Sequence, residues 1–156
     1  MVVLLCYVAW VNTFTELIVL SAASPATGQG VEQMADSEAL DTTIIANLTD
    51  EERRRSAVYL DKNALPAGKT TIGGRQIEVD HPYVMVFIDR NPGANWMHPC
   101  RYLLINPHTL QVTSVDSDRP PVFGVLPSSW RLVMRSPGLD DWRIIRIAPL
   151  EHGSTS

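Results

Sequence analysis

The second half of the sequence consists of short β-branched and aromatic runs separated by turn residues, and this pattern constrains the fold more than any other feature. Residues 69–72 and Arg75–Val79 flank Gly73-Gly74, a dipeptide typical of a two-residue hairpin turn. Residues 83–89 and 101–105 are almost entirely apolar, which is typical of central strands. The pattern predicts a mainly antiparallel sheet of about five to seven strands.

Further strands are predicted toward the C-terminus. Residues 106–109 read Asn-Pro-His-Thr, which suits a type I turn, and residues 110–115 alternate again. Residues 130–135 and 142–147 both begin with Trp-Arg and are separated by the polar, turn-rich segment 136–141. We expect these two runs to form a hairpin in which Trp130, Leu132 and Met134 share one face.

One helix is predicted before the strands, over residues 50–62. Thr49 and Glu52 have the spacing of a capping box, in which each side chain bonds the other residue's backbone amide. The acids at 50–52 favour the positive N-terminal end of a helix, and Pro66 and Gly68 lie beyond its expected end near Asn63. A short helix packed on an antiparallel sheet makes an α+β domain, which we place at residues 45–150.

The N-terminal segment is apolar over residues 2–23, with Glu16 near its middle. An export signal, a membrane anchor and a buried helix of the domain are the three interpretations, and small residues at 21–26 suit the first. Glu16 disfavours a spanning helix by about 2.5–3.5 kcal/mol. We expect a leader helix at residues 1–25, a flexible linker at 26–44 and a disordered tail at 151–156. The domain would then be exported, secreted or periplasmic, or anchored to a membrane.

Charge and cysteine content exclude several classes of protein. Residues 1–52 contain eight acids and no Lys or Arg, whereas the remainder has 13 basic residues and nine acids. That excess of four positive charges is too small to indicate a nucleic-acid-binding protein. The chain has two cysteines, and one of them, Cys6, lies in the apolar segment, so a disulfide framework is not expected.

The densest group of chemically versatile residues lies at 95–101, between two predicted central strands. Loops held by rigid strands often carry function. Asn95, Trp96, His98 and Arg101 have the composition of an interaction hot spot, so we expect them to bind a protein, peptide or glycan partner.

Three other interpretations of this region stay open. Cys100 could act as a nucleophile with His98 or His81 as its base, although an extended 98–100 segment would place the two side chains roughly 6–7 Å apart. A metal-assisted hydrolase is the related alternative, and its candidate ligands are Asp80, His81, His98 and Cys100, with His108 or Asp89 in addition. In a purely structural role, Trp96 would pack on the sheet and Arg101 would pair with Asp89.

The sequence therefore predicts a non-enzymatic, exported or membrane-tethered binding domain that uses the loop at residues 90–101. No cofactor, no resident metal and no nucleic-acid partner is expected, and residues 2–23 are the expected membrane contact.

Overall fold

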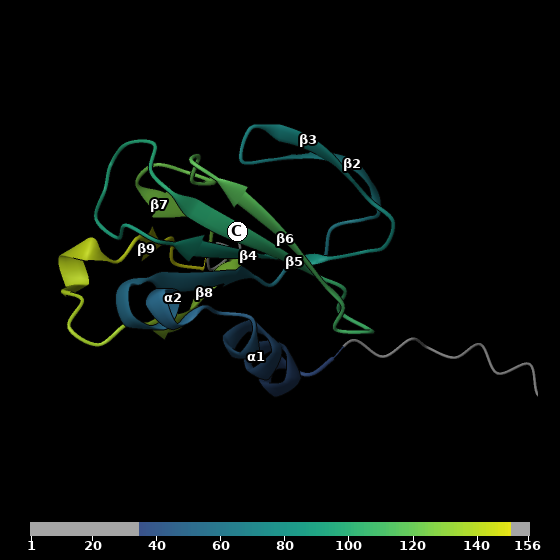
Figure 1. The fold of residues 1–156 in the computed structure, drawn as a ribbon, viewed down its shortest axis with the longest axis horizontal. Coiled ribbons are helices and arrows are strands. Elements are labelled where there is room, and N and C mark those ends of the chain that lie inside the picture. Colours follow the sequence, from purple (N-terminus) through teal and green to yellow (C-terminus); the bar gives the residue numbers. More distant parts are fainter. Residues whose placement is uncertain (1–34, 151–156) are drawn as a thin grey trace, which may run out of the picture. The chain divides into compact units, whose positions relative to one another are not determined.

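The computed structural model describes residues 35–150 and places an antiparallel five-stranded sheet at the centre of the fold (Figure 1). The strand order is β6-β5-β4-β1-β8, which confirms the mainly antiparallel β architecture predicted from the sequence. The elements, in chain order, are α1 (Ser37–Ala46), α2 (Asp50–Arg55), β1 (Ala57–Asp61), β2 (Gly68–Ile72), β3 (Arg75–Val79), β4 (Val84–Asp89), β5 (Cys100–Ile105), β6 (Val112–Ser117), β7 (Val125–Leu126), β8 (Trp130–Arg135), the 3₁₀ helix η1 (Asp141–Arg143) and β9 (Arg146–Ile147).

Both faces of the central sheet are covered. Alternate residues of β4 point to opposite faces, so Val86 and Ile88 join one apolar cluster while Phe87 joins the other. The two-sided burial explains why β4 and β5 read as nearly continuous apolar runs.

The first face is covered by the helices. Leu40 and Ile44 of α1 are buried against Val58, Val86 and Leu103 of the sheet. The carboxylate of Asp36 accepts a hydrogen bond of 2.7 Å from the amide of Ala39 and caps the helix. Residues 37–44, which we expected in a flexible linker, therefore lie in a packed helix.

The second face carries an aromatic core beneath the β2–β3 hairpin and the C-terminal segment. Tyr59, Phe87 and Tyr102 are buried there, with ring centroids 6.0 Å and 5.6 Å apart. The predicted Gly73-Gly74 turn is confirmed, with φ values of 56° and 78° that a glycine adopts without strain.

The helix predicted over residues 50–62 was wrong in its second half. The capping box is present, with Thr49 N donating to Glu52 at 2.9 Å, but α2 ends at Arg55. Residues 57–61 form β1 instead, paired with β4 on one side and β8 on the other. Four consecutive residues at 57–60 are buried, and as a strand they pack on both faces of the sheet. This burial favours a strand over a continuation of the helix.

The predicted hairpin of residues 130–135 with 142–147 was also wrong. β8 pairs with β1, whereas β9 pairs in parallel with β7. The hydroxyl of Tyr59 accepts a hydrogen bond of 2.8 Å from the amide of Ile145, which holds this segment over the sheet face and away from the β8 edge. A register shift opposite Val58 and Tyr59 also moves Met134 to the face opposite Trp130.

The expected leader at residues 1–25, the linker up to residue 34 and the tail at 151–156 lie outside the described residues. Within residues 35–150, neither helix has the length and apolarity needed to cross a membrane.

Candidate ligand-binding cleft

The β4–β5 connection, residues 90–99, forms most of the loop that we predicted at residues 90–101, and residues 100 and 101 already belong to β5. The carboxylate of Asp89 accepts from Asn91 N at 2.9 Å, and the carbonyl of Asn91 accepts from Ala94 N at 3.1 Å. The backbone of His98 donates to the carbonyl of Asp118 at 2.9 Å and ties the end of the loop to the residues that follow β6. Local turns and this anchor fix the loop at one end of the sheet (Figure 1).

His98 and Asp89 form a buried pair beneath this loop. Their side chains are 3% and 1% exposed, and Nε2 of His98 lies 3.0 Å from Oδ1 of Asp89. The other ring nitrogen, Nδ1, lies 2.7 Å from the carbonyl of Trp96, which can only accept, so Nδ1 carries a hydrogen. The Nε2–Oδ1 contact needs a second hydrogen, held by either partner, and the pair is neutral overall in both arrangements. Burial raises the pKa of Asp89, which favours retention of that hydrogen.

Cys100 begins β5 opposite Asp89 and is fully buried. Burial raises the pKa of its thiol to about 11, so the thiolate is scarce at neutral pH. Both ring nitrogens of His98 are engaged by Asp89 and Trp96, and no hydrogen bond joins Cys100 to a histidine among the described residues. The geometry therefore brings Cys100, His98 and Asp89 to one face of the sheet without forming a base–nucleophile contact.

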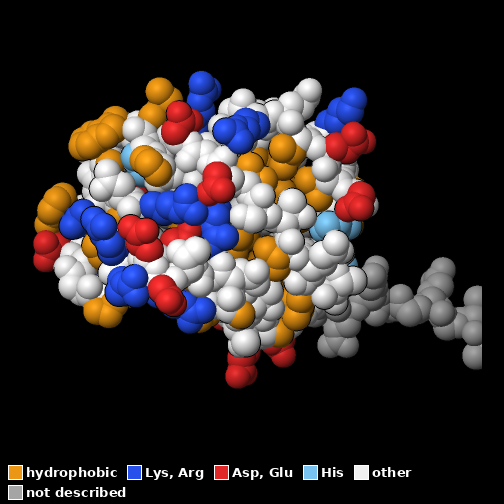
Figure 2. Space-filling view, in the orientation of Figure 1, with side chains coloured by type: hydrophobic (Ala, Val, Ile, Leu, Met, Phe, Trp, Pro, Cys, Tyr) orange, Lys and Arg blue, Asp and Glu red, His pale blue; other side chains and the backbone are white. Residues whose placement is uncertain are grey.

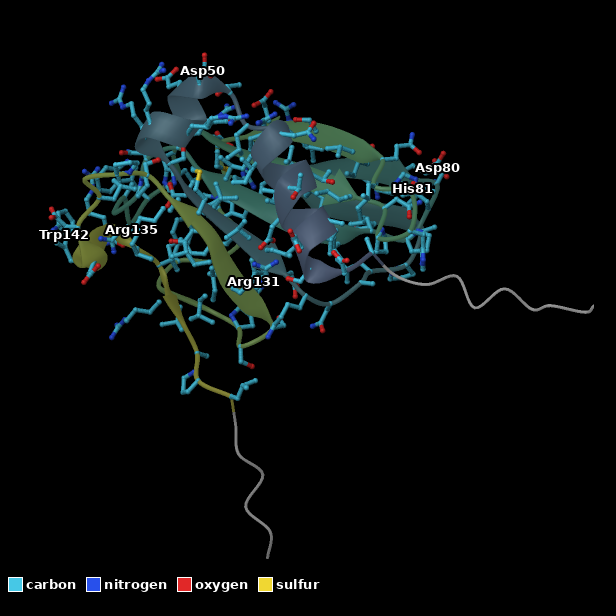
Figure 3. All side chains as sticks on the ribbon, turned by 90° about the horizontal axis from the view of Figure 1, so that it is seen from below. Asp50, Asp80, His81, Arg131, Arg135 and Trp142 are labelled. Carbon is cyan, nitrogen blue, oxygen red and sulfur yellow. The ribbon has the colours of Figure 1, made fainter. Side chains whose placement is uncertain are left out.

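The remaining candidate metal ligands are dispersed. His81 pairs with Asp80 at 2.5 Å before β4, at the opposite end of the molecule from Trp142 (Figure 3), and His108 lies in the β5–β6 turn. Across residues 35–150, no three His, Cys, Asp or Glu side chains are grouped as a metal site would require.

Arg101 lies under the helices, away from the loop surface where we expected it. Its guanidinium donates to both carboxylate oxygens of Glu52 and to the carbonyl of Asn47. Arg90 donates to the same carboxylate at 2.9 Å, so one buried acid joins α2 to the ends of β4 and β5. Burial alone would raise the pKa of Glu52, but the hydrogen bonds from Arg101, Thr49 and Arg90 together lower it.

A cleft of about 470 Å³ opens beside the 90–99 loop. Its walls are the loop, the segment at 120–124 and the segment of η1 and the residues after it. The lining residues are Gly93, Ala94, Asn95, His98, Pro120, Val122, Phe123, Gly124, Asp141, Trp142, Arg143, Ile144, Ile145 and Arg146.

Large apolar side chains are exposed in the lining of this cleft and in the loop that forms one of its walls. Phe123 is 60% exposed and Trp142 is 74% exposed, and both line it. Trp96 and Met97, at 64% and 56%, lie in the chain between the lining residues Asn95 and His98. Figure 2 shows apolar side chains projecting on the left of the molecule with basic side chains beside them, and Figure 3 shows Trp142 at the outer edge. We call Trp96, Met97, Phe123 and Trp142 the aromatic rim.

Arg143 connects two walls of the cleft. Its Nε donates to the carbonyl of Pro92 at 2.9 Å, and its guanidinium lies 5.7 Å from the ring centre of Trp142. The indole of Trp142 donates to Asp140 at 3.2 Å. Gly93 makes this approach close, because a Cβ there would lie 3.2 Å from the Trp142 ring. The walls are thus joined by defined contacts.

Two of the four predicted binding residues, Asn95 and His98, line the cleft, and Trp96 is exposed next to Asn95 in the chain. Sequence reasoning missed Phe123, Trp142, Arg143 and Arg146 as site residues. The exposed Trp142 is preceded by the turn signal Asp140-Asp141, which could have indicated a displayed side chain rather than a strand.

Comparison of the chain with models of protein families, with curated proteins and with solved structures finds no match in any of the three.

Proposed function

We propose that this domain is a non-enzymatic binding module that docks a protein partner on the aromatic rim and in the cleft beside it. The observation that carries the proposal is the exposure of Phe123 and Trp142 in the lining of one cleft that also holds Arg143 and Arg146, with Trp96 and Met97 exposed in the loop that forms one of its walls. Aromatic residues, Met and Arg are the types enriched in the cores of protein interfaces.

Energetics support docking at this place. Fully burying one large apolar side chain contributes about 1.5–3 kcal/mol, and the rim offers four of them. The contact of Arg143 with Pro92 joins the loop wall to the η1 wall before binding, so these two walls need little ordering when a partner arrives. The loop at residues 90–99 thus contributes one wall of a larger surface.

The test is selection of peptides from a random display library on the immobilised full chain. We expect specific enrichment on the wild-type protein and its loss on the double variant F123S/W142S, which removes two rim side chains. L132S is the matched control, because Leu132 is exposed on β8 and does not line the cleft. Equal enrichment on all three proteins would contradict the proposal.

We also propose that the domain is exported or held at a membrane, which the apolar run at residues 2–23 supports. Mass spectrometry of the protein from fractionated cells tests this. We expect either a processed N-terminus outside the cytosol or an intact chain in the membrane fraction. An intact Met1 in the soluble cytosolic fraction would contradict export.

A further inference from the structure

We propose that the partner presents an acidic peptide segment, whose carboxylates pair with Arg143 and Arg146 while neighbouring apolar side chains cover the aromatic rim. This inference rests on the proposed function and specifies the chemistry of the partner. Its basis is the charge left unpaired in the cleft.

Two guanidinium groups in the cleft have no carboxylate partner among the described residues. Among residues 35–150, neither Arg143 nor Arg146 forms an ion pair. Asp141 is the one acid among the lining residues, and its carboxylate pairs with Arg135 outside the cleft. The lining therefore carries positive charge that no carboxylate among the described residues neutralises.

The buried acid Asp89 interacts electrostatically with Arg143 but does not pair with it among the described residues. Asp89 contributes to the electrostatic surroundings of Arg143, but its Oδ1 already accepts from Asn91 N and contacts His98. No ion pair among residues 35–150 joins Asp89 to Arg143, so the Arg143 guanidinium stays available to a carboxylate from outside. A negatively charged ligand is favoured for this reason.

Arg143 is also positioned for a planar anion. Its Nε is held by Pro92 and its Cζ lies over the Trp142 ring, whereas the two terminal nitrogens form no hydrogen bond with residues 35–150. A guanidinium held in this way can offer two donors to one carboxylate without first losing side-chain freedom. The exposed Arg146 lies three residues further along the same wall, which suits a second carboxylate on the peptide.

A peptide explains both components of the surface. Four apolar rim residues need an apolar partner surface, and two arginines need acids within the same short segment. Acidic residues alternating with Leu, Phe or Trp in one peptide satisfy both requirements.

In the experiment, the peptides that the display selection enriches on the full chain are sequenced. The affinity of a synthetic consensus peptide for the full chain is then measured by fluorescence anisotropy. We expect Asp and Glu to be over-represented relative to the input library. R146Q should weaken binding about tenfold, because it removes charge-assisted hydrogen bonds without breaking a contact of the described fold. Raising the salt from about 50 to 300 mM should weaken wild-type binding several-fold.

R54Q is the matched control, because Arg54 is exposed on α2 and this substitution removes the same charge outside the cleft. R146E should shift the enriched pool from acidic toward basic peptides. An enriched pool with no acidic excess, or equal affinity of R146Q and wild type for the consensus peptide, would overturn the acidic partner and leave the binding module intact. No enrichment beyond that seen with F123S/W142S would overturn both.

Discussion

At the scale of single residues, Glu52 contributes to three elements at once. Its side chain completes the capping box with Thr49 and accepts hydrogen bonds from Arg90 and Arg101 while only 2% exposed. A buried carboxylate is tolerated only when its charge is compensated in this way. Removing that charge would leave Arg101 partly buried without a carboxylate partner and Arg90 with Asp116 alone, which costs more than the net contribution of the ion pairs themselves.

E52Q should therefore lower the free energy of unfolding by about 3 kcal/mol at pH 7. The pKa of Glu52 is lowered in the folded state, so its stabilisation is present above the unfolded value of 4.5 and is lost as pH falls through the lower folded value. The difference between variant and wild type should shrink at acidic pH. Urea denaturation at about pH 7 and pH 3 measures it.

E51Q is the control, because Glu51 is exposed and within residues 35–150 pairs only with Arg55 one turn away. It should change stability by less than about 0.5 kcal/mol. A loss for E52Q that is the same at both pH values would show that the charge of Glu52 does not stabilise this region.

At the scale of elements, sequence reasoning succeeded where the signal was local. The Gly73-Gly74 hairpin and the strands β4 and β5 follow from turn residues and apolar runs. It failed for β1 and β9, because the strands that pair with them are distant in the sequence. β1 forms between β4 and β8, and β9 pairs with β7. The candidate cleft was half predicted for the same reason. The loop wall is local in sequence, whereas the wall of Trp142 and Arg143 reaches it from about 50 residues away through Pro92.

The helix α1 was missed although its signal was present. Leu40, Ile44 and Leu48 recur every fourth position and face the sheet, but the surrounding acidic and small residues made the whole segment resemble a linker. Average composition was therefore a weaker guide than the spacing of three apolar residues.

If α1 is an integral part of the core, I44A should lower the free energy of unfolding by about 2–4 kcal/mol, because Ile44 is fully buried against the sheet. T42A should change it by less than about 0.5 kcal/mol, since Thr42 is exposed on the same helix. Thermal and urea denaturation of both variants make the comparison. Equal stability of I44A and wild type would mean that α1 does not stay docked in solution.

At the scale of the whole molecule, one sheet separates two apolar clusters. The helix-side cluster contains Ile44, and the opposite cluster contains Cys100 and the aromatic residues. β4 and β5 contribute side chains to both, so neither cluster can lose its packing without disturbing the strands that support the other. We therefore expect the described domain to unfold as one cooperative unit.

Cys100 reports on that cooperativity, in a C6S background where it is the remaining thiol. Burial and the raised pKa of about 11 should slow labelling by a thiol reagent at pH 8 at least about a hundredfold relative to an unfolded peptide. The protonated thiol favours the folded state below pH 9, and this contribution is lost as pH rises from 9 toward 11.

I44A lies on the other face of the sheet, yet it should accelerate this labelling by about tenfold for each 1.4 kcal/mol of stability it removes, provided that global unfolding exposes the thiol. T42A should leave the labelling rate unchanged. A rate for Cys100 that does not respond to I44A would show that the thiol is reached by local opening near the 90–99 loop. The two clusters would then be energetically separate, and the cleft walls would open without unfolding the helix-side core.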